Sequence, residues 1–410
     1  MFRWIFVFLL IVIIEIYAFQ AFRTITKVRS YQFMYAILNL VIIVYVINGL
    51  FHFDRSVGQT KQSLFTIGLL LLVSVPKILI TFVMIGEDIF RILSGMLTRF
   101  LGDNDYGNFL PERRKFVSQI AYGLAAIPFV SFLYGMTVGK YNFKVIKQTL
   151  TFDDLPDSFD GFTLAQISDI HSGSFDNPEK IQYAVDLINK QDFDLLLFTG
   201  DIVNTDATEM HPWIEIFKGL KNPTFGKYSI LGNHDYGTYK TWPSDKALAD
   251  NFEAVKDLHR QIDFKLLLDE NVKIIKDNQE IAIVGVENWG KNFGEKGDIN
   301  KASANLTKDD FKILLSHDPT HWEFVVKNHE KHFQLTLSGH THGFQFGIEI
   351  PGIIKWSPVQ YVYKQWAGLY ENLGRYVYVN RGFGFHAYPG RVGIWPEITI
   401  IELKKTKNIA

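Results

Sequence analysis

The chain has 410 residues, of which 47% are hydrophobic, carries a formal net charge of −1 and contains no cysteine. The lack of cysteine excludes a disulfide framework and thiolate metal ligands, and the balanced charge, without a long basic run, argues against nucleic acid as a partner. A mean hydropathy of +0.04 is high for a wholly soluble protein, and the apolar excess lies before residue 140. The composition predicts a membrane region followed by a soluble domain.

Four apolar stretches in this first part approach or exceed the roughly 20 residues that a helix needs to cross a bilayer. They cover residues 4–22, 33–53, 64–86 and 116–138. The alternatives are a cleaved signal peptide for the first and a soluble core helix for the fourth. The first is too long for a signal peptide, however, and small residues such as Gly123 and Ala125 let membrane helices approach closely. We expect residues 1–143 to form a transmembrane region of about four helices, with an interfacial or connecting helix near 87–101.

Two ionisable residues, Glu15 and Lys77, interrupt the first and third of these stretches. An ionisable group inside a bilayer is costly unless it is paired or hydrated. We expect the two side chains to form an ion pair. The alternative is a protonated Glu15 and a Lys77 side chain that reaches the membrane surface.

The charges of the loops predict the orientation of the chain. The segments after the first and third stretches are richer in Lys and Arg than the N-terminus and the segment after the second. Cytoplasmic loops carry such an excess, so the first and third loops are expected inside and both chain ends outside. The alternative is that the basic segment 140–147 lies at a cytoplasmic headgroup surface.

Residues 144–410 have the pattern of one layered α/β domain. Short apolar, strand-like runs alternate with helix-like stretches at 178–190, 247–260 and 319–328. Three closely spaced runs at 264–268, 272–275 and 281–286 predict hairpin strands of a second sheet. Two late strands, at 376–379 and 398–403, are expected to complete that layer.

Five of the strand-like runs are followed at once by side chains that bind metal ions. These segments are Asp169-Ile170-His171, Gly200-Asp201, Gly232-Asn233-His234-Asp235, Ser316-His317-Asp318 and Gly339-His340-Thr341-His342. Any one of them is compatible with a polar turn or a satisfied histidine. Five together predict ligands gathered at one edge of a sheet, as a two-metal hydrolase requires. Oxygen and imidazole ligands without thiolate favour Mn, Fe, Zn or Co.

The series D-x-H, G-D, G-N-H-D, H and G-H-x-H resembles the calcineurin-like metallophosphoesterase superfamily, and every motif is intact from Phe162 onward. The segment from Asn380 to Gly384, followed by Arg391 and Pro396-Glu397, is similar to a bacterial membrane-associated branch. The resemblance implies an α/β fold, a two-sheet layered sandwich flanked by helices, over residues 144–410. It also implies a metal-dependent phosphoesterase (phosphodiesterase or phosphatase) in a bacterial inner or cell membrane.

Carried onto this chain, the resemblance implies a role for each motif residue. One divalent ion would be held by Asp169, His171 and His342, and a second by Asn233, His317 and His340, with Asp201 bridging the two. His234 would face the substrate phosphate or the leaving oxygen, and Asp235 would orient His234. We further expect Arg381 and Arg391 to contact the substrate phosphate, with structural salt bridges as the alternative.

The substrate is less well defined by the sequence. Residues 356–370 carry five aromatic side chains that either form a wall facing a lipid or sugar or pack beneath a sheet. We expect a membrane-anchored phosphohydrolase that acts on a phosphorylated small molecule or lipid. The alternatives are a lipid A precursor (UDP-diacylglucosamine type) pyrophosphohydrolase, from which His234 points away because some such relatives carry Arg there, and a non-catalytic phospho-ligand sensor.

Overall fold

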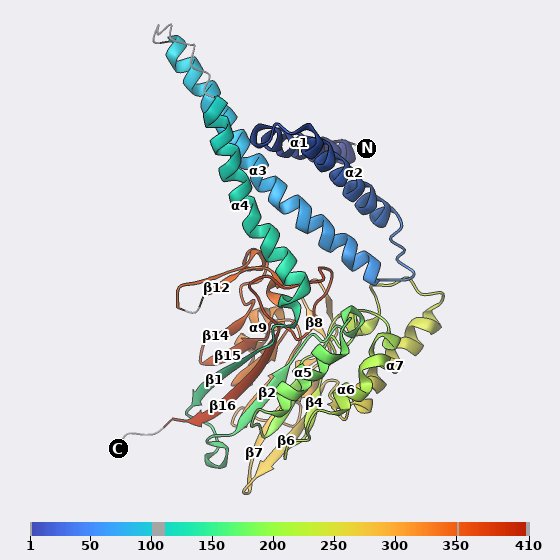
Figure 1. Cartoon of the computed structure of the whole chain (residues 1–410). Coiled ribbons are helices and arrows are strands. Elements are labelled where there is room, and N and C mark those ends of the chain that lie inside the picture. The colour runs from blue at the N-terminus through green and yellow to red at the C-terminus, as the bar shows by residue number, and fades with distance from the viewer. Residues whose placement is uncertain (1, 101–110, 351, 407–410) are drawn as a thin grey trace. The chain divides into compact units, whose positions relative to one another are not determined.

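The computed structural model describes residues 2–100, 111–350 and 352–406. The chain divides into two compact units. The N-terminal unit comprises Met1–Phe53 and Phe65–Met136, and the C-terminal unit comprises Asp54–Leu64 and Thr137–Ala410. The segment Asp54–Leu64, named here the 54–64 loop, thus belongs to the C-terminal unit although it connects two helices of the N-terminal one (Figure 1).

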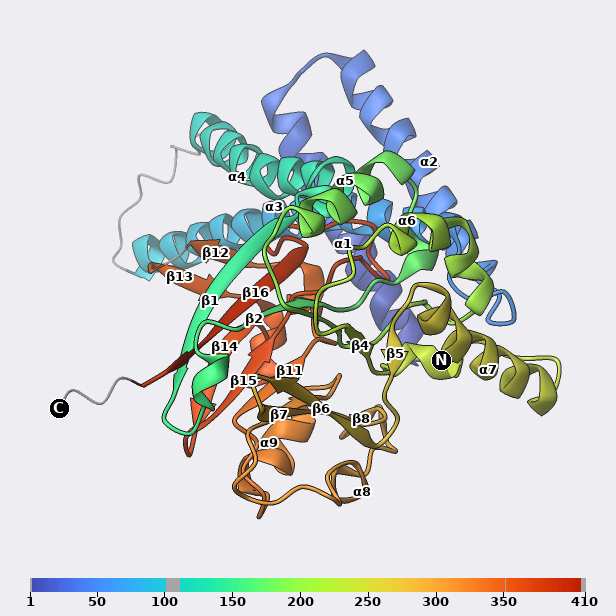
Figure 2. The same ribbon diagram turned by 90° about the horizontal axis from the view of Figure 1, so that it is seen from below.

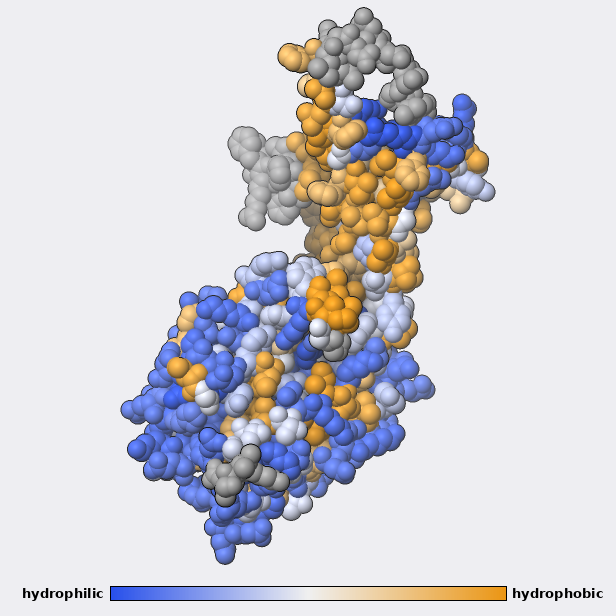
Figure 3. Space-filling model, turned by 90° about the vertical axis from the view of Figure 1, so that its left-hand side faces the viewer, coloured by the Kyte–Doolittle hydropathy of each residue, from blue (hydrophilic) through white to orange (hydrophobic). Residues whose placement is uncertain are grey.

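The N-terminal unit consists of helices that coincide with the four predicted spans: α1 (Phe2–Ile25), α2 (Arg29–Phe51), α3 (Lys61–Phe100) and α4 (Pro111–Thr137). Within the residues described, α2, α3 and α4 are each long and apolar enough to cross a membrane. The visible surface of this unit is largely hydrophobic (Figure 3). A separate helix was expected near residues 87–101. Residues 87–100 instead continue α3, and residues 101–110 lie outside the described part of the chain.

The predicted ion pair within the membrane region is confirmed. Nζ of Lys77 on α3 lies 2.5 Å from Oε1 of Glu15 on α1, and the Lys77 side chain is only 8% exposed. Pairing lowers the cost of placing both charges among apolar helices, so the two residues fix the contact between α1 and α3.

The C-terminal unit is the predicted α/β sandwich of two six-stranded sheets. The first sheet has the strand order β1 (Lys144–Phe152), β16 (Glu397–Lys405), β2 (Thr163–Ile167), β3 (Leu195–Phe198), β4 (Lys227–Ser229) and β5 (Lys265–Leu266). The second has the order β14 (Gly368–Asn372), β15 (Arg375–Val379), β11 (Leu335–Ser338), β10 (Lys312–Leu315), β7 (Gln279–Gly285) and β6 (Glu270–Lys276). Two small hairpins pair β8 (Trp289–Gly290) with β9 (Gly294–Glu295), and β12 (Ile348–Ile350) with β13 (Ile354–Trp356).

Helices cover the outer face of each sheet, which gives four layers (Figure 2). Beside the first sheet lie α5 (Pro178–Asn189), α6 (Ile214–Lys218) and α7 (Asp245–Gln261), and beside the second lie α8 (Ile299–Ala302) and α9 (Thr320–Phe324). Strands β3, β10 and β11 are fully buried and β2 nearly so, because both of their faces are covered. β3 is uniformly apolar, and the other three add one or two polar residues to an apolar run. Apolar side chains of the two inner faces form one core, which includes Leu164, Leu195, Leu197, Ile313, Leu335 and Leu337.

Two predicted strands exist but were assigned to the wrong sheet. Residues 265–266 form β5, which pairs in parallel with β4 of the first sheet instead of joining the hairpin β6–β7. The late strand β16 also belongs to the first sheet, between β1 and β2. The alternation of apolar residues identifies a strand but does not select its partner, because pairing between distant segments is decided by packing.

The 54–64 loop is bonded to the C-terminal unit at several points. The amide of Thr241 donates to the carbonyl of Arg55 over 3.0 Å, and Nε2 of Gln59 donates to Oγ of Ser174 over 3.0 Å. This loop precedes α3 and the sandwich follows α4, so an even number of crossings separates them if both helices span the bilayer. The loop and the sandwich then lie on the same side of the membrane.

That arrangement predicts the outcome of cysteine labelling, for which the cysteine-free chain gives no background. Single exposed cysteines at Ser56→Cys, in the loop, and Glu179→Cys, on α5, should react with an impermeant maleimide from the same side. Lys27→Cys, which one helix separates from the loop, should react only from the other side. Labelling of Ser56→Cys and Glu179→Cys from opposite sides would contradict the arrangement.

Candidate metal centre

The five predicted ligand segments all follow strand ends at one edge of the sandwich. Strands β2, β3 and β4 are mutually parallel in the first sheet, and β10 and β11 are parallel in the second. Parallel strands present their carboxyl ends at a common edge, where ligands collect. Residues more than 170 positions apart in sequence therefore meet, as when the amide of His340 donates to Asp169 over 3.0 Å.

Most of these ligand residues adopt a left-handed backbone conformation, which residues other than glycine rarely adopt. Positive φ angles of 47–71° occur at Asp169, His171, Asp201, His340 and His342. Each such residue costs on the order of 1–3 kcal/mol and persists only where the surrounding structure enforces it. The folded sandwich thus holds these side chains in a fixed inward orientation.

Two clusters of metal-binding atoms result. In the first, Asp169, His171 and His342 each offer one ligand atom within 4.8 Å of the others. In the second, Asp201, His317 and His340 do the same. Asp201 also touches the first cluster, because its Oδ2 lies 3.5 Å from Nε2 of His171 and 3.1 Å from Nε2 of His317.

Asn233 joins the second cluster. Its Oδ1 lies 2.7 Å from Nδ1 of His340, and its Nδ2 donates to the hydroxyl of Tyr239 over 2.8 Å. The structure thus brings together all seven side chains predicted as metal ligands. Asp318, to which no role was assigned, also reaches this cluster, with Oδ2 3.4 Å from Nε2 of His340.

Hydrogen bonds on the far side of the rings orient two of the histidines. Nδ1 of His317 is 2.7 Å from the carbonyl of Thr199, and Nδ1 of His171 is 3.1 Å from Oδ1 of Asn204. A ring that donates from Nδ1 leaves the lone pair of Nε2 free, which is how protein scaffolds prepare imidazole ligands. Both Nε2 atoms face Asp201.

The donor set fits divalent cations. Among the described residues, Nε2 of His317, Nε2 of His342 and Oδ2 of Asp318 are buried without a hydrogen-bond partner, although polar atoms are rarely left so. Burial opposes ionisation of Asp201, but the imidazoles of His317 and His234 outweigh it and hold the pKa of that carboxyl well below its usual range. Burial also opposes a charged His317, yet the Asp201 carboxylate raises the pKa of His317 to about 10. The Asp201 carboxylate is therefore ionised and in need of positive charge.

Two glycines in the motifs are required by close packing against the carboxylates. A Cβ atom at Gly232 would lie 2.2 Å from Oδ1 of Asp201, and one at Gly339 would lie 2.2 Å from Oδ2 of Asp169. Any side chain at either position would displace a predicted ligand. This explains why glycine precedes Asn233 and His340 in their motifs.

His234 lies at the edge of both clusters, but the predicted role of Asp235 needs correction. Nδ1 of His234 bonds to the carbonyl of Asn204 over 2.6 Å, not to Asp235. The Asp235 carboxylate instead accepts hydrogen bonds from the amides of Gly232, Asp201 and Ile202, at 2.8–2.9 Å. Asp235 thus joins the turns after β3 and β4 and positions the backbone, because its side chain points toward the peptide groups and not toward the ring.

The predicted contact of two arginines with substrate is also corrected. Arg381 is buried and forms ion pairs with Glu349 and Glu397, and Arg391 is fully buried with hydrogen bonds to the carbonyls of Gly384 and Arg381. Neither side chain lines the cavity at the metal centre. The donors of Arg381 are taken by glutamates on β12 and β16. Those of Arg391 are taken by carbonyls of the turn after β15 and by Nδ1 of His342, 3.2 Å away, so both arginines have a structural role.

The clusters open into a cavity of about 810 Å³. The polar side chains that line it include His171, Asp201, Asn233, His234, His340 and His342. The apolar ones, called here the apolar wall, include Phe293, Phe324, Phe344, Val362 and Tyr363. The predicted aromatic segment is divided between two roles. Tyr363 lines the cavity and its hydroxyl lies 2.8 Å from Nε2 of His340, whereas Trp366 is 4% exposed and packs in a small core with Ile394.

Three residues near the metal centre were not predicted from the sequence. Asn204 bonds to both His171 and His234, Tyr239 stacks on His234 with ring centroids 4.3 Å apart, and His386 lies beside both histidines. The only signal for Asn204 is its position three residues after Asp201, at the same strand end. His386 falls in a loop where spacing alone assigns no role.

A two-sheet sandwich whose parallel strands end in buried aspartate, asparagine and histidine ligands defines a metal-dependent phosphoesterase. Comparisons with known proteins agree. Residues 162–344 match the family model described as calcineurin-like phosphoesterase, and residues 2–140 match the one described as probable calcineurin-like phosphoesterase, transmembrane domain.

Relatives and solved structures extend the comparison. An uncharacterized metallophosphoesterase of Bacillus subtilis, YkuE, is 30% identical over 72% of this chain and 98% of its own length. A transmembrane protein with metallophosphoesterase domain from Danio rerio is 28% identical over 67% of this chain and 60% of its own. The solved NAD nucleotidase of Haemophilus influenzae aligns with a TM-score of 0.36 at 14% identity, over 55% of this chain and 46% of that chain, which is too distant to bear on the substrate. The chain belongs to the calcineurin-like metallophosphoesterase family, whose members typically bind divalent metals.

The contacts of Asn204 generate a test of ligand orientation. Asn204→Ala removes the partner of His171 but keeps the backbone carbonyl that bonds His234. Loss of such a supporting contact typically lowers metal affinity by about 10- to 100-fold, and we expect that decrease in a metal titration of the purified chain. Asn305→Ala, an exposed asparagine remote from the centre, serves as the control. Unchanged affinity in Asn204→Ala would show that the contact does not orient His171.

Proposed function

We propose that the chain is a membrane-anchored phosphohydrolase that uses two divalent ions to cleave a phosphoester bond of an amphipathic, lipid-type substrate. One observation carries the proposal: the same cavity is lined by metal-binding side chains, among them Asp201 and three histidines of the two clusters, and by aromatic and aliphatic side chains. A phosphate group suits the metal-binding side chains when they hold cations, and an apolar chain suits the apolar wall.

Each ion would be held by ligands from both sheets. Asp169, His171 and His342 would hold one, Asn233, His317 and His340 would hold the other, and Asp201 would be shared. The position of Asp201 between His171 and His317 supports the shared role. Ions bound here would supply Lewis acidity and a nucleophilic hydroxide near neutral pH, for which Mn, Fe, Zn and Co are all suitable.

His234 would act on the phosphoryl group. Because Nδ1 is directed to the carbonyl of Asn204, Nε2 is the nitrogen available to the cavity. Burial lowers the pKa of His234, so the free ring is neutral at pH 7. A phosphate dianion bound beside Nε2 favours the protonated ring. The ring takes up that proton from solvent when the substrate binds, and the proton can then pass from Nε2 to the leaving oxygen as the phosphoester bond breaks.

Two substitutions separate metal binding from proton transfer. Asp201→Asn removes the shared negative charge and should abolish both metal loading and turnover. His234→Ala should retain the metal and lower kcat by about 10²–10⁴-fold, the usual contribution of a general acid. Metal content by elemental analysis and hydrolysis of a nitrophenyl phosphate ester, measured on both variants, decide the assignment. Loss of metal in His234→Ala would show that His234 is a ligand.

The apolar wall supports a lipid-type substrate. Phe324 is 51% exposed and Val362 67% exposed, and both line the cavity. The hairpin β12–β13 also carries the exposed side chains of Ile348, Ile350, Ile353 and Ile354. Contiguous exposed apolar residues are unusual on a soluble domain and mark a surface that meets another apolar body. Nζ of Lys291, over the ring of Phe324 at 4.0 Å, adds a positive charge suited to an anionic headgroup.

Substitutions in this wall should distinguish lipid from soluble substrates. Phe324→Ser should lower kcat/KM for a long-chain phospholipid or lipid-linked sugar phosphate by about 10-fold or more, since burial of such a side chain contributes about 1.5–3 kcal/mol. The same variant should hydrolyse nitrophenyl phosphate esters and nucleotides like the wild type. Tyr183→Ser, at an exposed aromatic on α5, is the matched control. Equal effects on both substrate classes would argue against an acyl-binding wall.

The metal centre is proposed to face the outside of a bacterial cell membrane. The support is the excess of Lys and Arg where α1 joins α2 and where the C-terminal part of α3 leads to the start of α4. These residues are Arg23, Lys27 and Arg29 for the first, and Arg91, Arg99, Arg113, Arg114 and Lys115 for the second. With intact cells, the impermeant maleimide should therefore label Ser56→Cys and Glu179→Cys, and Lys27→Cys only after lysis. The reverse pattern would place the centre in the cytoplasm and favour a cytoplasmic lipid precursor as substrate.

A further inference from the structure

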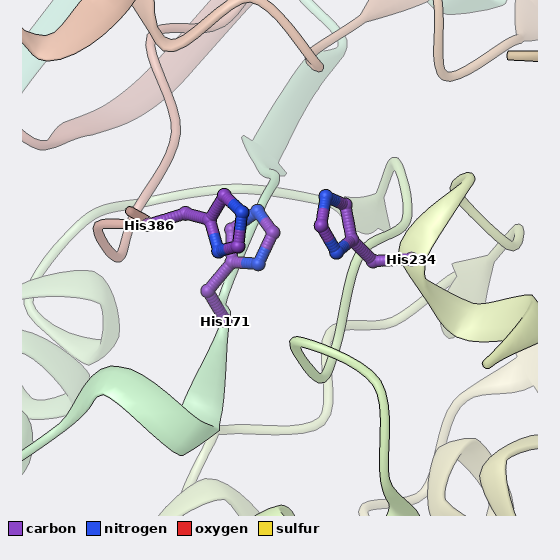
Figure 4. Close-up of side chains that lie close together, drawn as sticks. All are labelled: His171, His234 and His386. Atoms are coloured by element: carbon purple, nitrogen blue, oxygen red, sulfur yellow. The ribbon is translucent and has the colours of Figure 1, made fainter. Parts of the chain in front are cut away.

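One further histidine, which lies outside the five motifs, packs against the candidate metal centre. His386, in the loop after β15, stacks on His171 with ring centroids 4.9 Å apart and an interplanar angle of 21°. Its ring centroid is 4.4 Å from that of His234 (Figure 4). One nitrogen from each of the three rings lies within 4.8 Å of the other two. His386 also lines the cavity.

The backbone at His386 is held from two directions. The amide of His386 donates to Oε1 of Gln345 over 2.6 Å, and the amide of Ala387 donates to Oε1 of Gln59 over 2.9 Å. Ala387 has a φ of +59°, a strained value for a residue with a Cβ. The two glutamines compensate for that strain and thereby fix the direction of the His386 side chain. Gln59 belongs to the 54–64 loop, which connects α2 with α3.

Gln59 reaches the other two histidines as well. Its Nε2 donates to Oγ of Ser174, and that oxygen accepts from Nδ2 of Asn204 over 3.1 Å. Asn204 in turn contacts Nδ1 of His171 and Nδ1 of His234. One side chain of the 54–64 loop is thus linked by hydrogen bonds to Asn204, which orients His171 and His234, and to the backbone amide that follows His386.

The chemistry of the three-histidine cluster favours an anion over a further cation. Nδ1 of His386 is buried and has no hydrogen-bond partner in the described part of the chain, so the ring has an unused polar group beside the cavity. The cluster contains no carboxylate of its own, and a third cation beside two others would be repelled by both. A phosphoryl group between the ions and the rings would instead receive hydrogen bonds from imidazole N–H groups.

We propose that His386 binds a phosphoryl oxygen of the substrate beside His234, and that Gln59 of the loop between α2 and α3 positions His386. The proposal rests on the proposed phosphoester hydrolysis. It makes His386 a catalytic-site residue and Gln59 a positioning residue. The 54–64 loop, which belongs to the C-terminal unit, then contributes a positioning side chain next to the phosphate site.

The first experiment measures metal content, affinity for inorganic phosphate and hydrolysis of nitrophenyl phosphate esters by the full-length chain in detergent. His386→Ala should keep its metal, bind phosphate roughly 10- to 100-fold more weakly, and raise KM more than it lowers kcat. His386→Gln, which keeps an N–H donor, should recover part of the phosphate affinity. His211→Ala, an exposed histidine outside the cavity, should match the wild type in every measurement.

Two results overturn the assignment of His386. Loss of metal in His386→Ala would make it a metal ligand, and unchanged phosphate affinity with metal retained would leave it without a role in binding. Because phosphate binding is measured directly, these results are readable even if the wild type hydrolyses none of the esters. Failure of the wild type to hydrolyse any ester while it binds metal and phosphate would count against the proposed function alone.

The second experiment tests the positioning role by a double-mutant cycle. Gln59→Ala should weaken phosphate binding in the wild type by several-fold but have little further effect in the His386→Ala background, because positioning acts only through the residue positioned. Ser56→Ala in the same loop is the matched control. Equal losses from Gln59→Ala in both backgrounds, or no loss in either, would overturn the positioning role.

Discussion

The buried carboxylate of Asp201 ties the two sheets of the sandwich together. It follows β3 of the first sheet, yet its Oδ2 lies 3.1 Å from His317 of the second. A carboxylate in so apolar an interior is tolerated only if opposite charge or hydrogen bonds surround it. Imidazoles and the amide of His234 provide that surrounding. The ends of β3 and β10 must therefore lie side by side at the same edge of the sandwich. The packing of the two sheets and the chemistry at that edge depend on the same contact between Asp201 and His317.

Strain at this edge is offset by the core behind it. The ligand residues with positive φ come just after strands whose side chains are almost all buried. Rigid strands leave the turns little freedom, so unfavourable backbone angles become the only ones available. Such preorganisation means that the ligands need not rearrange when a cation or phosphate arrives, which is the condition for tight and selective binding.

Much of the architecture was predictable because it rests on local patterns. Apolar runs identified the strands, and the motif at each strand end identified the seven side chains of the two clusters. Partners between distant segments were not predictable: β5 and β16 joined the first sheet because of packing that no alternation encodes. The partner of Asp235 was also missed, since sequence proximity to His234 does not reveal where a carboxylate points. Asn204 and His386 act through contacts across loops, for which no spacing rule exists.

The 54–64 loop limits how this protein can be divided into a membrane fragment and a soluble fragment. A fragment that begins at Thr137 would contain both sheets and all seven clustered ligands but would lack the 54–64 loop. The amides of Ala387 and Thr241 and the hydroxyl of Ser174 would each lose a partner. The excised sandwich is consequently not equivalent to the catalytic half of the intact chain. Any chimera that replaces the membrane helices must carry this loop with it to preserve the original site.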